Sequence, residues 1–344
     1  MKAACIFEHG DLEKVRIENI DAPHPGPGEV LLEVHSAALN HLDIWVRKGR
    51  PGSSYSYPHV LGSDAAGVVL KLGEGVNDIK AGDEVILNPG LSCGKGEFCE
   101  RGEQNVDPAF GIMGLSRSGA FAEQICVPSG NLLPKPSHLD WNEAAALPLA
   151  YLTAWRMLMT RACLAPGETV LIHGIGGGVA IAGLQLARLA GAEVLATSSS
   201  DEKLERARKL GARHTINYRS NPEVGKAVRE LTGGRGVDIA FDTVGAATWP
   251  VNFEAVRRGG RIVHCGVTGG AAVQANISAL YWNHLTVMGS TMGSHADFRQ
   301  MVRAVSAAGM KPVIDQVFPL DQARQAMGRM EAGEQFGKIV LKVK

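Results

Sequence analysis

The sequence has no excess of charge of either sign, since its 344 residues include 35 Lys and Arg and 35 Asp and Glu. This balance excludes a strongly basic nucleic-acid surface or a charged membrane arm as a dominant feature. Cysteine is also scarce: six residues are too few for a disulfide scaffold and fit a reducing compartment. The first ten residues lack the apolar run of a signal peptide. We therefore expect a cytoplasmic protein that binds neither nucleic acid nor membrane.

Long uninterrupted apolar runs are missing as well. The most apolar stretch, residues 171–187, is broken by His173 and by five glycines between positions 174 and 183. It therefore predicts a strand, a tight turn and a buried helix rather than a membrane span. Glycine is abundant, with 42 residues against a usual share of ~7%. Such an excess indicates positive φ angles or close backbone approaches.

The chain length suggests about two domains, and the residue pattern changes along the chain in agreement. Residues 1–140 predict mainly strands and loops, for example at 29–35, 65–72 and 84–87. From about 168 to 293, short apolar runs alternate with helical patterns, and the tail at 312–344 predicts a strand, a helix at 321–333 and a strand. The apolar runs cover residues 169–174, 192–198, 214–218, 237–244, 261–266 and 285–290. Six buried strands with helical crossovers predict an α/β fold with a doubly wound parallel sheet.

A glycine-rich turn follows the first of these strands and opens a helix. It contains Gly174, Gly176, Gly177, Gly178 and Val179. Glycines let the backbone approach a pyrophosphate, and a helix N-terminus supplies free N–H donors and a positive dipole end. Within repeated β/α units this pattern favours a dinucleotide-binding site over a simple tight turn.

The residues after the second strand bear on the choice of dinucleotide. An NAD site usually carries a carboxylate about 20 residues after the turn, but Ser198 stands there, followed by two further serines. Hydroxyl groups and Lys203, in the first turn of the next helix, suit a 2′-phosphate. Tyr218 and Arg219 follow the third strand and are further candidates. We predict NADP; the alternative is that Lys203 is a surface residue balanced by the two acidic residues before it.

Several segments together resemble the medium-chain dehydrogenase/reductase superfamily. They are GDLEKVRIENIDAPHPGPGEVLLEV, AALNHLDIWVRKG, PHVLGSDAAGVV, AGDEVILNPGLSCG, EAAALPLAYLTAW, the glycine-rich turn, FDTVG, CGVTGG and QFGKIVL. The resemblance implies a GroES-like β-rich catalytic domain at 1–145 and 312–344 and a Rossmann domain at 146–311. It also implies nicotinamide hydride transfer in a homodimer or homotetramer, with the sixth strand of the sheet available to pair across a dimer. The superfamily has zinc alcohol dehydrogenases and zinc-free quinone or enone reductases as large branches.

The resemblance implies that this chain lacks the catalytic zinc ligands. Asn40 stands where the zinc branch has its first ligand, a Cys, and Ser63 where it has a His. The third ligand has no counterpart. The group Asp43, His59 and Asp64 remains as an alternative site, but all three soft or imidazole ligands of the zinc branch are absent.

A second, structural zinc lobe is also incomplete. The positions that match its four cysteines are Cys93, Gly96, Cys99 and Asp107. Glycine offers no side-chain ligand, and a closed structural site needs four. We predict a lobe without metal, with two free thiols or a reversible disulfide.

Without zinc, the protein must itself stabilise the negative charge that develops on the acceptor oxygen. The resemblance makes Asn40 the first candidate, because its amide can donate to a substrate oxygen. Tyr55 and Tyr57 offer phenol donors from one loop, and the choice between them stays open. Ser63 is expected to line the same pocket. Each of these side chains has an alternative role in shaping its loop.

Further cofactor contacts follow from the family motifs, because such ligands lie at loops after the carboxyl ends of parallel strands. These candidates are His41, Thr153, Thr243, Val244, Gly266, Val267, Thr268, Ser290, Met292 and Lys338.

The sequence thus predicts a zinc-independent oxidoreductase that transfers hydride from NADPH to a quinone or an α,β-unsaturated carbonyl compound. One alternative is a metal-dependent alcohol dehydrogenase with atypical ligands. Another is an NADP(H)-binding sensor or structural protein with little turnover.

Overall fold

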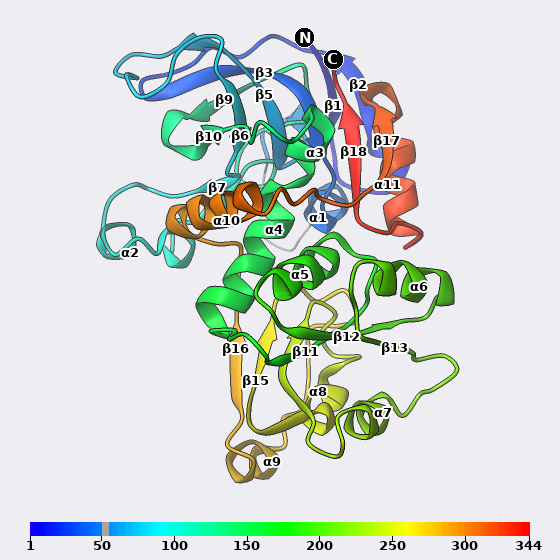
Figure 1. The fold of residues 1–344 in the computed structure, drawn as a ribbon. Helices are drawn as coiled ribbons and strands as arrows, with labels where there is room; N and C mark the ends of the chain where they lie inside the picture. Colours follow the sequence, from blue (N-terminus) through cyan, green and yellow to red (C-terminus); the bar gives the residue numbers. More distant parts are fainter. Residues whose placement is uncertain (50–54) are drawn as a thin grey trace. The chain divides into compact units, whose positions relative to one another are not determined.

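The computed structural model describes residues 1–49 and 55–344 and divides into two compact units. The first unit comprises Met1–Leu152 and Met292–Lys344, and the second comprises Thr153–Thr291 (Figure 1). The first unit thus includes residues 146–152 and 292–311, which the sequence pattern assigns to the other domain. Helix α10 (His295–Ala307) is part of this difference, since the His295 amide donates to Oε1 of Gln104 at 3.4 Å within the first unit.

The first unit is built on a mainly antiparallel sheet whose central strand is β3 (Glu29–Ala38). Strand β3 pairs with β5 (Asp64–Leu72) and with β18 (Lys338–Lys342), which returns from the end of the chain. Ala38 lies opposite Asp64 on one side and Val340 on the other. This register brings the starts of β5 and β18 next to the segment that follows β3.

The other elements of the first unit extend this sheet or cover it. Strands β10 (Leu132–Pro134), β6 (Glu84–Leu87), β9 (Gln124–Pro128) and β17 (Ile314–Pro319) complete the sheet; β2 (Arg16–Asn19), β1 (Lys2–Ile6) and β4 (His59–Val60) form a second sheet; β7 (Gly90–Leu91) pairs with β8 (Gly111–Ile112). The α-helices that begin in this unit are α1 (His41–Lys48), α2 (Glu97–Glu100), α3 (Trp141–Ala146), α4 (Pro148–Trp155), α10 and α11 (Ala323–Glu331). Shorter 3₁₀ turns lie at Leu12–Lys14, Gln104–Val106, Ser129–Asn131 and Leu320–Gln322.

The second unit contains a six-stranded parallel sheet in the order β13-β12-β11-β14-β15-β16, which confirms the doubly wound prediction (Figure 1). Its strands are β11 (Thr169–Ile172), β12 (Glu193–Ser198), β13 (His214–Asn217), β14 (Val237–Asp242), β15 (Val256–His264) and β16 (Thr286–Gly289). Helices α5 (Gly178–Leu189) and α6 (Asp201–Lys209) cover one face, and α7 (Val224–Leu231) and α8 (Trp249–Ala255) the other (Figure 1). A π-type turn, Arg156–Arg161, precedes the sheet, and α9 (Ile277–Trp282) precedes β16.

Two sequence expectations differ from the structure. Strand β16 was expected to be buried, but three of its four residues are exposed, because it is an edge strand with a neighbour on one side only. The tail helix, expected at 321–333, starts as the 3₁₀ turn Leu320–Gln322 and continues as α11 to Glu331. No helix within the described ranges 1–49 and 55–344 has the length and apolar character that crossing a membrane requires.

Candidate active site and cofactor loops

A buried lysine joins three parts of the first unit. Lys338, at the start of β18, is 3% exposed. Its ammonium donates to the carbonyl of Leu39 at 2.7 Å, to Oδ1 of Asn40 at 2.6 Å and to Oδ2 of Asp64 at 2.9 Å. A lysine ammonium has three hydrogens to donate, and these contacts use all three. Lys338 was predicted to contact the cofactor, but in this arrangement its Nζ has no donor left for one.

The same contacts fix the amide of Asn40. Its Oδ1 accepts from the Lys338 ammonium, and its Nδ2 donates to Oδ2 of Asp64 at 2.9 Å. The reverse orientation would place the NH₂ group against the ammonium, so the charges define which way the amide points. Nδ2 also donates to the Ala38 carbonyl, at the longer distance of 3.5 Å. As an oxyanion donor, Asn40 would have to give up one of these partners.

Two buried carboxyl groups connect this cluster to backbone N–H groups. Oδ1 of Asp64 accepts from the Leu149 amide at 2.8 Å, which ties β5 to the start of α4. Oδ2 of Asp43 accepts from the backbone N–H of Asn40 at 2.7 Å in the capping box of α1. Burial raises the pKa of Asp43 to about 7. We call Asn40, Asp43, Asp64 and Lys338 the polar hub.

The remaining candidates for catalytic zinc ligands also bind protein groups. The Ser63 hydroxyl donates to the Met113 carbonyl at 2.7 Å. Nε2 of His59 donates to the Gly114 carbonyl at 2.9 Å, and burial lowers the pKa of this histidine. The Asp64 carboxylate already faces an ammonium, which would repel a metal cation. These residues therefore do not fit a catalytic zinc.

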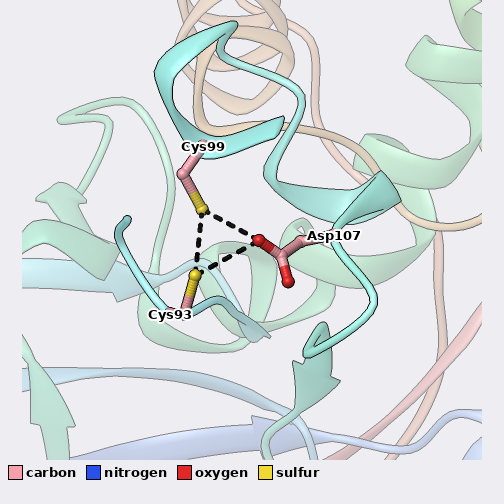
Figure 2. Close-up of side chains that lie close together, drawn as sticks. All are labelled: Cys93, Cys99 and Asp107. Atoms are coloured by element: carbon pink, nitrogen blue, oxygen red, sulfur yellow. Dashed lines mark hydrogen bonds between the residues drawn. The ribbon is translucent and has the colours of Figure 1, made fainter. Parts of the chain in front are cut away.

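Within residues 1–49 and 55–344, one group of three potential metal ligands lies close enough together to share an ion. It consists of Cys93, Cys99 and Asp107 (Figure 2). These are the residues that the sequence pattern assigns to the incomplete structural lobe.

The two candidate tyrosines have different surroundings. The Tyr55 ring packs against His59, with centroids 4.4 Å apart, and against the edge of His9 at 5.2 Å. Its buried Oη has no hydrogen-bond partner among the described residues. Tyr57 is 43% exposed. Residues 50–54 of the same loop lie outside the described residues.

The glycine-rich turn of the second unit has the backbone geometry that glycine permits. Gly174 has φ 63° and Gly176 has φ 135°, values that other residues seldom adopt. Gly177 is the N-cap of α5, so Gly178 and Val179 begin the helix. The first backbone N–H groups of a helix have no intrahelical acceptor. The turn therefore fits the pyrophosphate of a dinucleotide.

The NADP candidates are brought together where β12 pairs with β13. Ser198 lies opposite Asn217, and the Tyr218 amide donates to the Ser198 carbonyl at 3.1 Å. The Ser200 hydroxyl caps α6 by accepting from the Lys203 amide at 3.3 Å. Ser198 and Tyr218 thus lie at the carboxyl ends of β12 and β13, and Lys203 lies in the first turn of the helix that follows β12. Their contact with a cofactor stays a prediction.

The structure adds a buried carboxylate that sequence reasoning missed. Oδ1 of Asp242, at the end of β14, accepts from the amides of Val244 at 2.7 Å and Gly245 at 3.2 Å. Oδ2 accepts from Thr248 Oγ1 at 2.7 Å and from Asn252 Nδ2 at 2.6 Å. Asp242 therefore shapes the loop that carries the candidates Thr243 and Val244. An acidic residue at the end of a buried strand was the available signal.

Asn252 extends this network to the glycine-rich turn. Its Oδ1 accepts from Nε2 of His173 at 2.9 Å, and His173 directly precedes Gly174. The same histidine lies 3.4 Å from Thr197 Oγ1, at the end of β12. One buried hydrogen-bond chain thus connects the loops after β11, β12 and β14.

The other candidates lie on separate elements, and their cofactor contacts stay predictions. Gly266, Val267 and Thr268 are exposed after β15. Ser290 follows β16, and neither its Oγ nor Nδ1 of His264 has a hydrogen-bond partner in the described part of the chain. Nδ1 of His264 lies 3.8 Å from Oδ2 of Asp242. Polar atoms without a hydrogen bond at the carboxyl edge of the sheet fit a polar ligand. The first unit holds His41, which opens α1, and the buried Met292; Thr153 is buried in α4.

Two family models match the chain. The family described as "Alcohol dehydrogenase GroES-like domain" matches residues 26–137, and "Zinc-binding dehydrogenase" matches residues 178–307.

Individual relatives extend these matches to nearly the whole chain. The zinc-type alcohol dehydrogenase-like protein C1773.06c of Schizosaccharomyces pombe is 34% identical over 98% of this chain and 97% of its own length. A crotonyl-CoA reductase of Streptomyces avermitilis is 30% identical, covering 95% of this chain and 81% of its own length. A solved structure described as an NAD-dependent alcohol dehydrogenase has 41% identity, a TM-score of 0.95 and coverage of 100% of both chains.

The two units and their loops thus define a GroES-like domain joined to a Rossmann-like domain, the architecture of a nicotinamide-dependent oxidoreductase. The chain belongs to the medium-chain dehydrogenase/reductase superfamily, in its zinc-type alcohol dehydrogenase-like branch.

Proposed function

We propose that this protein is a zinc-independent oxidoreductase that transfers hydride from NADPH to an electron-poor acceptor. The acceptor is a quinone or an α,β-unsaturated carbonyl compound, a class that includes enoyl thioesters. The observation that carries the proposal is the polar hub, in which the Lys338 ammonium binds Asn40 and Asp64 where the zinc branch has metal chemistry. The crotonyl-CoA reductase relative supports the enoyl class.

The acceptor class follows from the chemistry of a site without a Lewis acid. A metal ion polarises a carbonyl or acidifies an alcohol, and oxidation of an unactivated alcohol becomes difficult without it. An enone or quinone is already electron-poor and accepts hydride directly from the cofactor. The protein then has to orient the two reactants and stabilise the charge that develops on oxygen.

The edge formed by β12 and β13 supports NADP. Ser198 stands at the end of β12, where an NAD site usually has a carboxylate. Lys203 lies in the first turn of α6, where an anion offsets the unfavourable position of a cation near the positive dipole end. The solved structure with 41% identity carries NAD in its name, so both cofactors belong in the test.

Tyr55 is the better candidate of the two tyrosines for the proton that the acceptor oxygen takes up. Its Oη is buried and has no partner within the described ranges, whereas Tyr57 is largely exposed. Asn40 is the second candidate to donate a hydrogen bond to the substrate oxygen. It ranks second because its Nδ2 would first have to break its contact with Asp64 or with Ala38. Lys338 and Asp64 then act as positioning residues that hold Asn40.

The test compares NADPH and NADH oxidation by chelator-treated protein with three acceptors: a small quinone, a simple enone and crotonyl-CoA. We expect NADPH to be consumed faster than NADH and the rate to survive the chelator. Activity that disappears with the chelator and returns with zinc would instead establish a metal-dependent dehydrogenase. Tight NADPH binding without turnover on any acceptor would favour a sensor or structural protein.

A homodimer is the assembly we propose, because the exposed edge of the second unit suits self-pairing. Among the described strands β16 pairs with β15 alone, and Ile277, Tyr281, Trp282 and Val287 near it are each at least 40% exposed. Two copies of one edge strand can pair antiparallel about a two-fold axis. Sedimentation should show a dimer that Val287→Lys weakens; a monomer would refute this assembly.

The six free cysteines support a cytoplasmic location.

A further inference from the structure

Two cysteines and an aspartate form a compact group outside the polar hub and the cofactor loops. Sγ of Cys93 lies 3.7 Å from Sγ of Cys99. Oδ2 of Asp107 lies 3.2 Å from the first sulfur and 3.3 Å from the second (Figure 2). Cys93 follows β7, Cys99 belongs to α2, and Asp107 follows the 3₁₀ turn Gln104–Val106.

This group does not fit the closed structural zinc site that the family implies. A closed site takes four protein ligands, and Gly96 stands where a further cysteine would be. Gly96 has φ 89°, and a Cβ added there would meet no atom within 4 Å. Cys93 is exposed and Cys99 is half-buried, so the two thiols are accessible for other chemistry.

We propose that Cys93 and Cys99 form a reversible intramolecular disulfide by exchange with a low-molecular-weight disulfide of the glutathione type. The two sulfurs need to approach by about 1.7 Å to reach the S–S bond length of ~2.05 Å. The loop between them contains Gly94 and Gly96, both with positive φ and open space around them. This short glycine-containing loop and α2, which is one turn long, can take up the movement.

The other cysteines do not offer such a pair. Cys5 and Cys126 are buried, so a dissolved disulfide does not reach their thiols. Burial also raises the pKa of Cys265 to about 12. Cys163 is exposed, and its thiol donates to the Thr160 carbonyl instead of lying beside a second thiol.

The exchange balances in two steps. The thiolate of the exposed Cys93 attacks one sulfur of glutathione disulfide, which breaks that S–S bond and releases one glutathione thiolate. The Cys99 thiolate then attacks the Cys93 sulfur of the mixed disulfide and releases the second glutathione. The protein loses two electrons and two protons, and one glutathione disulfide becomes two glutathione thiols.

Asp107 affects the rate of the first step, the attack of the Cys93 thiolate. Oδ2 of Asp107 accepts from the thiols of Cys93 and Cys99, and its Oδ1 accepts from the Ala109 amide at 2.7 Å. A carboxylate beside a thiol disfavours the thiolate, which is the attacking species. Asp107→Asn should therefore form the same disulfide several-fold faster than the parent protein.

The test uses the full chain with Cys163→Ser as the background, because this removes the other exposed thiol. The reduced protein is incubated with a mixture of oxidised and reduced glutathione, alkylated and weighed by mass spectrometry. We expect a loss of two hydrogen atoms and no glutathione adduct. Trypsin cleaves after Lys95, between the two cysteines. The peptides 81–95 and 96–101 should therefore be joined before reduction and separate after it.

Single variants and the metal content complete the test. Cys93→Ser and Cys99→Ser should each gain one glutathione instead of losing two hydrogens. Adducts on both cysteines of the background protein, or two thiols that stay reduced, would overturn the proposal. Protein that is isolated with one zinc per chain, and whose two thiols react only after chelation, would also overturn it. In that case the lobe is a metal site.

Discussion

The polar hub predicts a large loss of stability when Lys338 is replaced by Met. The substitution removes the ammonium but leaves a side chain of similar length. Asp64, which is fully buried, then keeps a charge whose partner at 2.9 Å is gone. Removing one partner of a buried ion pair costs about 3–5 kcal/mol, because the remaining charge stays out of water without compensation. The Leu39 carbonyl and Asn40 Oδ1 lose a donor as well.

The matched control replaces both members of the pair. Asp64→Asn together with Lys338→Met leaves no unpaired charge, and the Asn oxygen can still accept from the Leu149 amide. We expect this double variant to recover at least half of the stability that Lys338→Met loses. Urea unfolding, followed by circular dichroism and fluorescence, measures both losses. A loss below about 1 kcal/mol for Lys338→Met, or no recovery in the double variant, would refute the buried ion pair.

Three further predictions concern the polar hub, the proposed 2′-phosphate site and the two candidate tyrosines. Because burial raises the pKa of Asp43 from 3.8 to about 7, the folded protein holds a proton that the unfolded chain releases. Between about pH 4 and pH 8, the free energy of unfolding of the parent protein should therefore fall by about 4 kcal/mol more than that of Asp43→Asn. Urea unfolding measures both values, and a difference between the two proteins that stays constant over this range would contradict the prediction. Lys203→Ala should raise KM for NADPH about tenfold more than KM for NADH in steady-state assays, since a phosphate contact contributes roughly 1–2 kcal/mol; equal effects would argue against the 2′-phosphate site. Tyr55→Phe should lower kcat about 10²-fold while Tyr57→Phe keeps it near the parent value, and the reverse order would assign the proton to Tyr57.

The local features of the second unit could be predicted from the sequence. Six apolar runs with helical crossovers indicated the parallel sheet, because strand and helix periodicities are visible over short windows. The glycine-rich turn was an equally local signal. The exposure of β16 was not visible, because an apolar run does not reveal which strand has only one neighbour.

The polar hub could not be predicted in the same way. Asn40 and Ser63 were singled out as replaced zinc ligands, but their partners are far away in sequence. Lys338 reaches Asn40 because β18 pairs with β3 in one particular register, nearly 300 residues along the chain. Register between distant strands depends on the packing of the whole sheet rather than on local composition. The Asp242 network was missed for a similar reason, since it joins the ends of separate strands.

Hydride transfer by metal-free protein tests the central claim most directly. The measurement uses NADPH with deuterium at C4 of the nicotinamide, on the face from which the hydride leaves. The protein is treated with a chelator and verified to be free of zinc, and a simple enone serves as acceptor. We predict one deuterium on the β-carbon of the reduced product and a rate that does not depend on added zinc. A product without deuterium, or turnover that appears only when zinc is restored, would contradict the account.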